Sequence, residues 1–326
     1  MDSNPVPGAQ QHAEQSVREG SPAAVPASPF APERDALFSE SPAETYKQPE
    51  GFHLFGRWFL YIAIAVAMLL LLNSLLYRLP AASPDWLFWD LAGEIRLLLA
   101  AILPGLLMAR IEGRPFGAFG IPAKNAFGRD FWTGALWGLG ALTVLMLALR
   151  AFGVFSFGTL HLHGPRVLKL GLFYAVFFLI AALFEEFLMR GYSQWILAKA
   201  MGFWPAAAVL SIVFGAIHGL NPGEASVGLV AVVAIGFFFC LTLRRTGTLW
   251  WAVGFHAAWD WGESFLYSVP DSGNLARGHL LNSSLHGPSW LTGGSVGPEG
   301  SYLVFALMGA LWLLFSRAHP GVKYES

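Results

Sequence analysis

The sequence predicts an all-α fold, a polytopic membrane helix bundle of about eight transmembrane helices that follows a disordered N-terminal tail. The composition supports this first, because 55% of the 326 residues are hydrophobic and only 13% are charged, whereas soluble domains average about 25% charged residues. The apolar residues also stand in runs close to the roughly 20 residues that a spanning helix needs. These features argue against a disordered chain, a soluble enzyme and a nucleic-acid-binding protein.

The N-terminal segment has a different character from the rest of the chain. Residues 1–50 contain eight acidic and three basic residues, are rich in Pro, Ala, Ser and Glu, and include no apolar run of the signal-peptide kind. Such a segment cannot bury enough apolar surface to offset the entropy of ordering. We therefore expect a disordered cytoplasmic tail at 1–53, a transmembrane domain at 54–318 and a short C-terminal tail at 319–326.

Eight apolar segments follow the tail, and each is a candidate membrane span. The fifth and seventh are the weakest by hydropathy, and the fourth is expected to continue as a helix to about Ala198. In order, the segments are Phe59–Leu76, Trp86–Met108, Phe131–Phe152, Leu168–Leu188, Phe203–His218, Val227–Leu243, Leu249–Leu266 and Tyr302–Phe315.

The distribution of Lys and Arg predicts the orientation of the spans. With eight spans, both tails and the even-numbered loops share one side, which holds eleven nearby bases against five on the other side. By the positive-inside rule both termini are cytoplasmic, and we expect the membrane to be the bacterial plasma (inner) membrane. The long loop at about 270–300 is rich in Gly, Ser and Asn and is interpreted as either a lid or a plain linker.

Charged residues inside apolar spans need a reason, because each costs on the order of 2.5–3.5 kcal/mol near the bilayer centre. The first such cluster is Glu185-Glu186-x-x-x-Arg190 in the fourth span. A helix places Glu186 and Arg190 on one face as an ion pair and leaves Glu185 pointing about 100° away. This arrangement is typical of a catalytic base, here Glu185, that lies beside a structural ion pair. Alternatively, the helix end could reach water, which would solvate both acids.

Two histidine clusters lie in the weaker spans. His218 ends the fifth span as Phe214-x-x-x-His218, and His256-x-x-x-Asp260 places an imidazole and a carboxylate on one face of the seventh span, which Glu263 extends by a turn. A capped or packed histidine would account for the first cluster. A satisfied His–Asp pair within an aromatic belt would account for the second.

A further group of ionisable residues occupies the second span. Asp90, Glu94 and Arg96 are interpreted mainly as bridges between helices, with the lining of a cavity as the alternative.

Taken together, the three motif clusters favour a hydrolytic site. Burying one unpaired acid, two histidines and a carboxylate separately would be costly, whereas a shared hydrated cavity would satisfy all of them. A carboxylate and a histidine that share a water can deprotonate it, and a second histidine can stabilise the oxyanion formed on an attacked amide.

The same motifs resemble, in order and on the right spans, those of the CAAX-protease and bacteriocin-processing (CPBP/Abi) family. That family contains intramembrane endopeptidases related to the type II CAAX prenyl protease. Gly191-Tyr192 and Thr246-Gly247-Thr248-Leu249 are also similar to the family pattern. The resemblance covers about residues 168–261 and implies that 54–318 is a CPBP-type protease domain acting as a membrane-embedded endopeptidase.

The resemblance also implies residue roles. Glu185 would activate the water with His218, and His256 would contribute to an oxyanion site. Asp260 stands where many members have asparagine, and since a carboxylate cannot donate a hydrogen bond unless protonated, we expect it to orient His256 instead. The supporting residues would be Glu186 and Arg190, which hold the fourth helix, and Phe214, which packs beneath the site.

Metal dependence, partners and rival functions remain open at this point. Glu185, His218 and His256 have the composition of a catalytic zinc site, but His-Glu-x-x-His is absent, so zinc is a candidate cofactor and a metal-free glutamate mechanism is preferred. The expected partners are a peptide or membrane-protein substrate and the lipid bilayer, without nucleic acid. A non-catalytic immunity or scaffold protein of the same fold is the main alternative, and a proton-coupled transporter is a weaker one.

Overall fold

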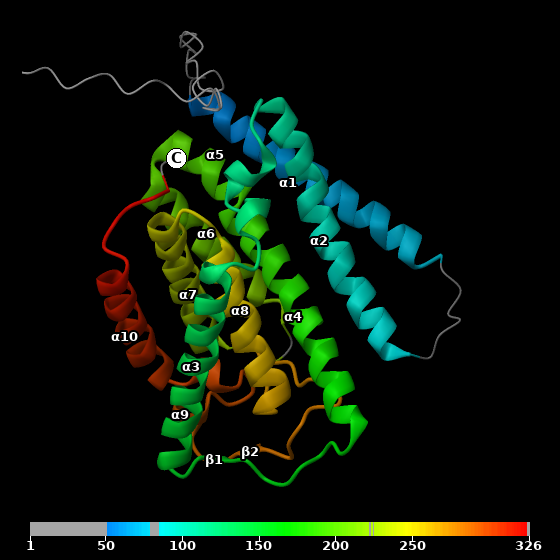
Figure 1. Ribbon diagram of the computed structural model, residues 1–326, viewed down its shortest axis with the longest axis vertical. Helices are drawn as coiled ribbons and strands as arrows, with labels where there is room; N and C mark the ends of the chain where they lie inside the picture. Colours follow the sequence, from blue (N-terminus) through cyan, green and yellow to red (C-terminus); the bar gives the residue numbers. More distant parts are fainter. Residues whose placement is uncertain (1–50, 79–84, 222, 224, 325–326) are drawn as a thin grey trace, which may run out of the picture. The chain divides into compact units, whose positions relative to one another are not determined.

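The computed structural model describes residues 51–78, 85–221, 223 and 225–324 (Figure 1). The predicted tail therefore falls outside the described residues, apart from its last three positions. The helices are α1 (Gly51–Leu76), α2 (Trp86–Ile111), α3 (Arg129–Ala151), α4 (Pro165–Arg190), α5 (Tyr192–Met201), α6 (Phe203–His218), α7 (Ser226–Thr246), α8 (Trp250–Trp261), α9 (Ser289–Thr292) and α10 (Leu303–Ala318). The shorter elements are η1 (Phe116–Phe119), η2 (Ala123–Asn125), the π-turn η3 (Gly262–Leu266), η4 (Pro298–Gly300) and the strands β1 (Phe155–Ser156) and β2 (Ser284–Leu285).

All eight predicted spans are helical, but five helical stretches in the described residues are long and apolar enough to cross a membrane. These are α1, α2, α3, α7 and the α4–α5 stretch. The helices α6 and α10 have 16 residues each and α8 has 12, which is short of the roughly 20 needed for a full crossing. Eight complete crossings are therefore not confirmed.

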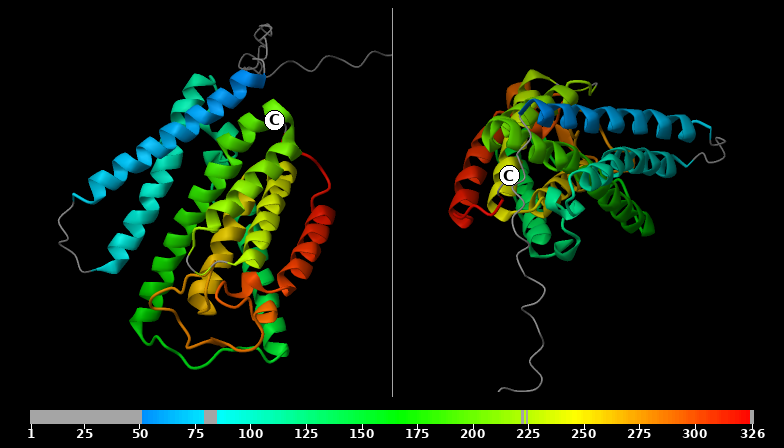
Figure 2. Two further views of the ribbon diagram at one scale, coloured as in Figure 1. Left: turned by 180° about the vertical axis from the view of Figure 1, so that it is seen from behind. Right: turned by 90° about the horizontal axis from the view of Figure 1, so that it is seen from above.

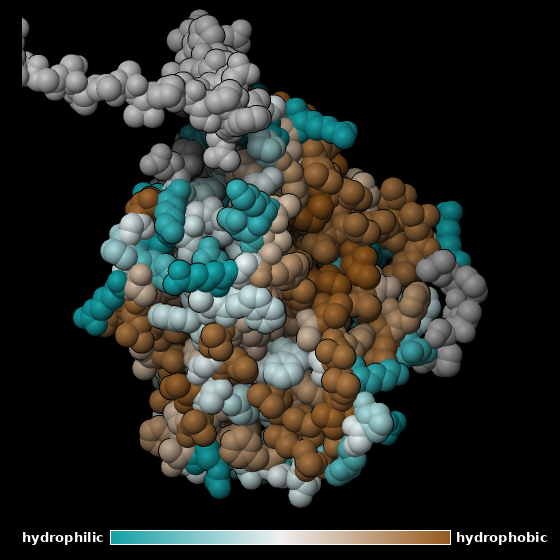
Figure 3. All heavy atoms as spheres, in the orientation of Figure 1, coloured by the Kyte–Doolittle hydropathy of each residue, from teal (hydrophilic) through white to brown (hydrophobic). Residues whose placement is uncertain are grey.

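The outer surface has the character of a membrane protein. Leu70 on α1, Leu136 on α3 and Leu168 on α4 are among the large apolar side chains that are more than 60% exposed. Figure 3 shows apolar side chains gathered over α1, α2 and α4. Continuous exposed apolar surface of this kind is unfavourable in water and is expected where lipid covers it.

The fourth predicted helix is broken where the sequence predicted continuity. The chain leaves helical geometry at Gly191, where ψ is −116°, and α5 then begins at Tyr192. A Cβ at position 191 would lie 2.4 Å from the carbonyl oxygen of Phe187, so only glycine fits this corner. The chain is therefore helical past Ala198, as expected, since α5 runs to Met201, but the corner at Gly191 divides it and ends α4 shortly after the Glu185–Glu186 pair.

The order of neighbours explains how the site is held. Helix α8 packs between α3 and α4, and α4 also packs on α2 (Figure 2). Helices α3 and α8 approach backbone to backbone, because Cβ atoms at Gly134 and Gly138 would lie 2.0 and 2.2 Å from the carbonyl oxygens of Trp251 and Phe255. The G-x-x-x-G spacing is typical of close contacts between membrane helices. Because Gly138 contacts Phe255, this contact positions α8 next to His256.

One end of the bundle is covered by the loop of about residues 270–300. Strand β2 in this loop pairs antiparallel with β1, with Phe155 opposite Leu285, and the loop also contains α9 and η4. The segment is therefore a folded cover rather than a plain linker.

Candidate active site

The neighbouring acids on α4 face different surroundings. Glu186 is fully buried and accepts a hydrogen bond from Nη1 of Arg190 at 3.1 Å, as the i, i+4 spacing predicted. Glu185 is rotated about 100° away and keeps 27% of its side chain exposed. Its Oε2 atom is itself buried and has no hydrogen-bond partner among the described residues.

His218 reaches Glu185 from the last turn of α6. Its Nδ1 atom lies 3.0 Å from the carbonyl oxygen of Phe214, and a carbonyl can only accept, so Nδ1 carries the proton. The other nitrogen, Nε2, lies 4.0 Å from Oε2 of Glu185. Glu185 and His218 are therefore close enough for one water to hydrogen-bond to both.

His256 on α8 has three carboxylates around it. Its Nδ1 atom donates to Oε1 of Glu186 at 3.0 Å. Its Nε2 atom lies 3.4 Å from Oδ2 of Asp260 and 3.6 Å from Oε2 of Glu185. Because carboxylates surround both nitrogens, the doubly protonated imidazolium is the form that this environment favours.

The contacts of His256 change one sequence expectation. Asp260 was expected to orient the ring, but the short contact to a ring nitrogen comes from Glu186, a residue expected only to hold the helix with Arg190. Asp260 faces the opposite nitrogen at the longer distance. The i, i+4 rule found the pairs within α4 and within α8, but it could not reveal a bond between the two helices.

The supporting residues pack as a layer behind the site. The guanidinium carbon of Arg190 lies 4.3 Å from the centre of the Phe214 ring, and that ring contacts the His218 ring at 4.4 Å between centroids. Gly236 on α7 makes room for the guanidinium, because a Cβ there would lie 2.5 Å from Nη2 of Arg190. Phe214 and Arg190 are thus brought together with His218.

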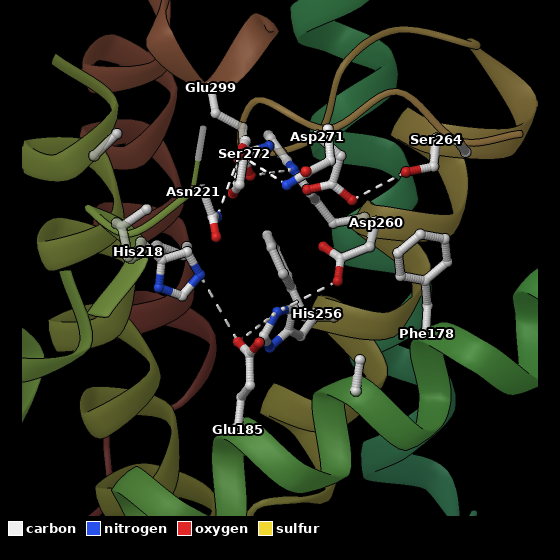
Figure 4. Close-up of a pocket in the computed structure, with 18 of the residues that line it drawn as sticks. Phe178, Glu185, His218, Asn221, His256, Asp260, Ser264, Asp271, Ser272 and Glu299 are labelled. Carbon is white, nitrogen blue, oxygen red and sulfur yellow. Dashed lines mark hydrogen bonds and ion pairs between the residues drawn. The ribbon is translucent and has the colours of Figure 1, made fainter. Parts of the chain in front are cut away.

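These side chains open into a cavity of about 510 Å³. Figure 4 shows Glu185, His218 and His256 facing one another across it, with Asp260 on the α8 side. The predicted residues Glu185, Phe214, His218, His256 and Asp260 all line the cavity. A cavity with convergent ionisable groups in an apolar bundle is a typical setting of a catalytic site.

Several cavity-lining residues were not found from the sequence. Asn221 donates from Nδ2 to the carbonyl oxygen of Ser272 at 3.2 Å, which joins the end of α6 to the covering loop. Asp271 and Glu299 also line the cavity from this loop. The sequence showed only that these residues lie in polar loops, and loop composition does not predict which way a side chain points.

Glu263 does not extend the His256 face as expected. The π-turn η3 begins at Gly262, and it turns Glu263 towards Trp259, whose Nε1 atom donates to both Glu263 and Glu299. Glu263, Asp271 and Glu299 place carboxylate oxygens within 4.8 Å of one another, a spacing that a metal ion could bridge. Burial and the neighbouring charges of Asp260 and Glu299 raise the pKa of the Asp271 carboxyl well above its ordinary value.

The fold and the cavity define a class of protein, a helical integral membrane protein with one carboxylate between two imidazoles in its interior. The family model described as type II CAAX prenyl endopeptidase Rce1-like matches residues 167–262. This segment contains all three motifs, so the predicted family resemblance is confirmed there. No curated protein matches the chain.

Proposed function

We propose that the protein is a membrane-embedded endopeptidase that hydrolyses peptide bonds with a water activated by Glu185 and His218. The observation that carries this proposal is the gap of 4.0 Å between Oε2 of Glu185 and Nε2 of His218. A water in this gap would lie about 2.8 Å from both atoms, an ordinary hydrogen-bond length. The match to a family of endopeptidases supports the same reaction.

The tautomer that the Phe214 contact favours suits this role. With Nδ1 of His218 donating to Phe214, the neutral form of His218 would present a bare Nε2 atom, and an ionised Glu185 would present a carboxylate oxygen. The two acceptors take both hydrogens of the water and leave an oxygen lone pair for the carbonyl carbon of the substrate. As the new C–O bond forms, Glu185 takes one proton from the water.

The second half of the reaction uses His256. The carbonyl π electrons move onto its oxygen, and the Nε2–H of the His256 imidazolium would donate to this oxyanion. When the oxyanion collapses and the C–N bond breaks, protonated Glu185 returns its proton to the leaving amine. Glu186 would hold His256 through Nδ1, and Asp260 would favour the charged form of the ring.

Zinc fits the composition of the donor set but not its spacing. Ligands bound tetrahedrally about 2.0 Å from zinc lie about 3.3 Å apart, whereas the Nε2 atoms of His218 and His256 lie 4.0 and 3.6 Å from Oε2 of Glu185. We therefore propose that hydrolysis requires no tightly bound metal. Metal analysis of purified protein should find less than stoichiometric zinc, and chelation should leave turnover intact; reversible loss of turnover on chelation would contradict this.

We propose that the substrate is a peptide or membrane protein, that the membrane is the bacterial inner membrane and that both termini are cytoplasmic. Bases from the predicted cytoplasmic side gather at one end of the bundle. Arg57 forms an ion pair at 2.8 Å with Glu112, which follows the end of α2. The ammonium nitrogen of Lys199 lies 4.1 Å from the centre of the Trp195 ring. The backbone N–H groups of Lys323 and Tyr324 donate to the carbonyl oxygen of Arg244.

Cysteine labelling in whole cells tests this orientation. The native Cys240 is fully buried and is replaced by serine as background. A cysteine at the exposed Lys323 should resist an impermeant reagent until the membrane is opened, whereas a cysteine at the exposed loop residue Asn282 should react at once. The reverse pattern would show the opposite orientation.

The central experiment compares cleavage of a quenched peptide library by the purified full-length wild type and by Glu185→Ala. We expect turnover by the wild type and its loss in the variant, while Asp130→Asn, at a half-buried position in the first turn of α3 that does not line the cavity, should retain it. Equal turnover by wild type and Glu185→Ala would exclude the mechanism. Rescue of a cellular phenotype by Glu185→Ala would favour a scaffold, and His218-dependent proton flux in liposomes would favour a transporter.

A further inference from the structure

The cavity is strongly acidic. Its lining includes six carboxylates, from Asp90, Glu94, Glu185, Asp260, Asp271 and Glu299, but among the described lining residues Arg277 is the one Lys or Arg. With every carboxyl ionised and His218 and His256 both protonated, the formal charge is −3, and it is still −2 when Asp271, whose pKa is raised, is counted as neutral. A concave site with one sign of charge and low-dielectric walls concentrates its field and attracts ligands of opposite charge.

Arg277 does not neutralise the interior of this cavity. Its Nη2 atom contacts both carboxylate oxygens of Asp90, at 2.9 and 3.1 Å, and its guanidinium carbon lies 4.9 Å from the centre of the Trp86 ring. The hydroxyl of Tyr174 donates to the backbone carbonyl of Arg277. This cation is therefore fixed against the start of α2, where it balances Asp90 alone.

Glu94 is the acid left without a partner on this side. It lies four residues after Asp90, on the same face of α2, and like Asp90 it lines the cavity. Across the described residues its side chain has no ion pair or hydrogen bond, and the nearby Arg96 instead donates to Asn73. An unpaired carboxylate in an apolar bundle is costly, and a cation entering the cavity would offset that cost.

We infer that the preferred substrates are peptides with a basic side chain, Lys or Arg, near the scissile bond, and that Glu94 receives this side chain. The inference rests on the proposed endopeptidase function and adds a substrate class to it. Glu185 and His218 act on the peptide bond, while Glu94, from the α2 side of the same cavity, binds the ammonium or guanidinium group. Specificity arises because an acidic side chain at that position would meet only like charge.

The experiment uses full-length protein in nanodiscs and quenched peptides that are identical except at one position, which carries Lys, Gln or Glu and is moved stepwise along the peptide. At one position, wild type should prefer Lys over Gln by about 10-fold or more in kcat/KM, the range of a charge-assisted hydrogen bond. Glu94→Gln should reduce this ratio to near one. The matched control Asp130→Asn should keep the wild-type ratio.

Failure of this inference can be told apart from failure of the proposed function. If wild type cleaves peptides but shows no Lys preference, or if Glu94→Gln keeps the preference, the inference is overturned and the endopeptidase stands. If no peptide is cleaved, the proposed endopeptidase function is wrong. Binding of the Lys and Gln peptides to Glu185→Ala then tests whether Glu94 receives a basic side chain. Tighter Lys binding that disappears in Glu185→Ala/Glu94→Gln would support the assignment of Glu94, and equal binding would overturn it.

Discussion

Oε1 of Glu186 accepts hydrogen bonds from two partners, Nη1 of Arg190 at 3.1 Å and Nδ1 of His256 at 3.0 Å. The carboxylate is completely buried. It therefore joins the ion pair of α4 to His256 on α8. In the proposed mechanism Glu186 would be a positioning residue, because it would act on the reaction through the orientation and charge of His256.

Replacing Glu186 should separate positioning from folding. Glu186→Gln keeps the size of the side chain but removes the charge that favours the His256 imidazolium. We expect kcat to fall about 10- to 100-fold with a smaller change in KM, and the basic limb of the pH–rate profile should move to lower pH. Steady-state kinetics across pH test this. An unchanged pH profile with reduced thermal stability would assign Glu186 a purely structural role.

The glycine contact between α3 and α8 should be sensitive to a single methyl group. In Gly138→Ala the new Cβ would lie 2.2 Å from the carbonyl oxygen of Phe255, so α8 must move and carry His256 with it. We expect a loss of about 1–3 kcal/mol of stability together with reduced turnover. Gly140→Ala is the matched control on the same helix, since its Cβ meets nothing within 4 Å; similar losses in both variants would refute this explanation.

Asp260 offers a test of the oxyanion site. Its Oδ2 atom lies 3.4 Å from Nε2 of His256. An amide can donate to an oxyanion, so we expect Asp260→Asn to stay within about 10-fold of wild-type kcat/KM while Asp260→Ala loses more. Measured rates in the opposite order would show that the negative charge matters more than a donor.

Asp271, an acid of the covering loop, should make stability depend on pH. The pKa of Asp271 is raised in the fold by burial and by nearby Asp260 and Glu299, so the folded state binds its proton more tightly than the unfolded chain. The resulting stabilisation is complete below the unfolded pKa of about 3.9 and is lost as pH rises through the folded pKa. Thermal unfolding between pH 5 and 8 should show a falling Tm, and Asp271→Asn should flatten that slope. A slope that survives in the variant would place the effect elsewhere.

The sequence anticipated the central residues because each motif lies within one helix. The i, i+4 spacing of Glu186 and Arg190 led directly to their ion pair, and the need to satisfy isolated ionisable groups brought Glu185, His218 and His256 to one cavity. Asn221 and Ser272 could not be anticipated in the same way. They are joined by a loop contact across 51 positions of the chain, for which the sequence carries no periodic signal.

The sequence by itself determined that the chain is helical and apolar and that a few ionisable side chains must share a polar interior, because composition and helical spacing are local properties. Only the tertiary structure decided which ring nitrogen faces which carboxylate, that α4 ends at Arg190 before the corner at Gly191, and that Glu94 has no hydrogen-bond or ion-pair partner among the described residues. These features depend on the rotation and close approach of separate helices. Glycines such as Gly134 and Gly138 allow α3 and α8 to approach so closely that a single added methyl group would collide with the backbone of α8.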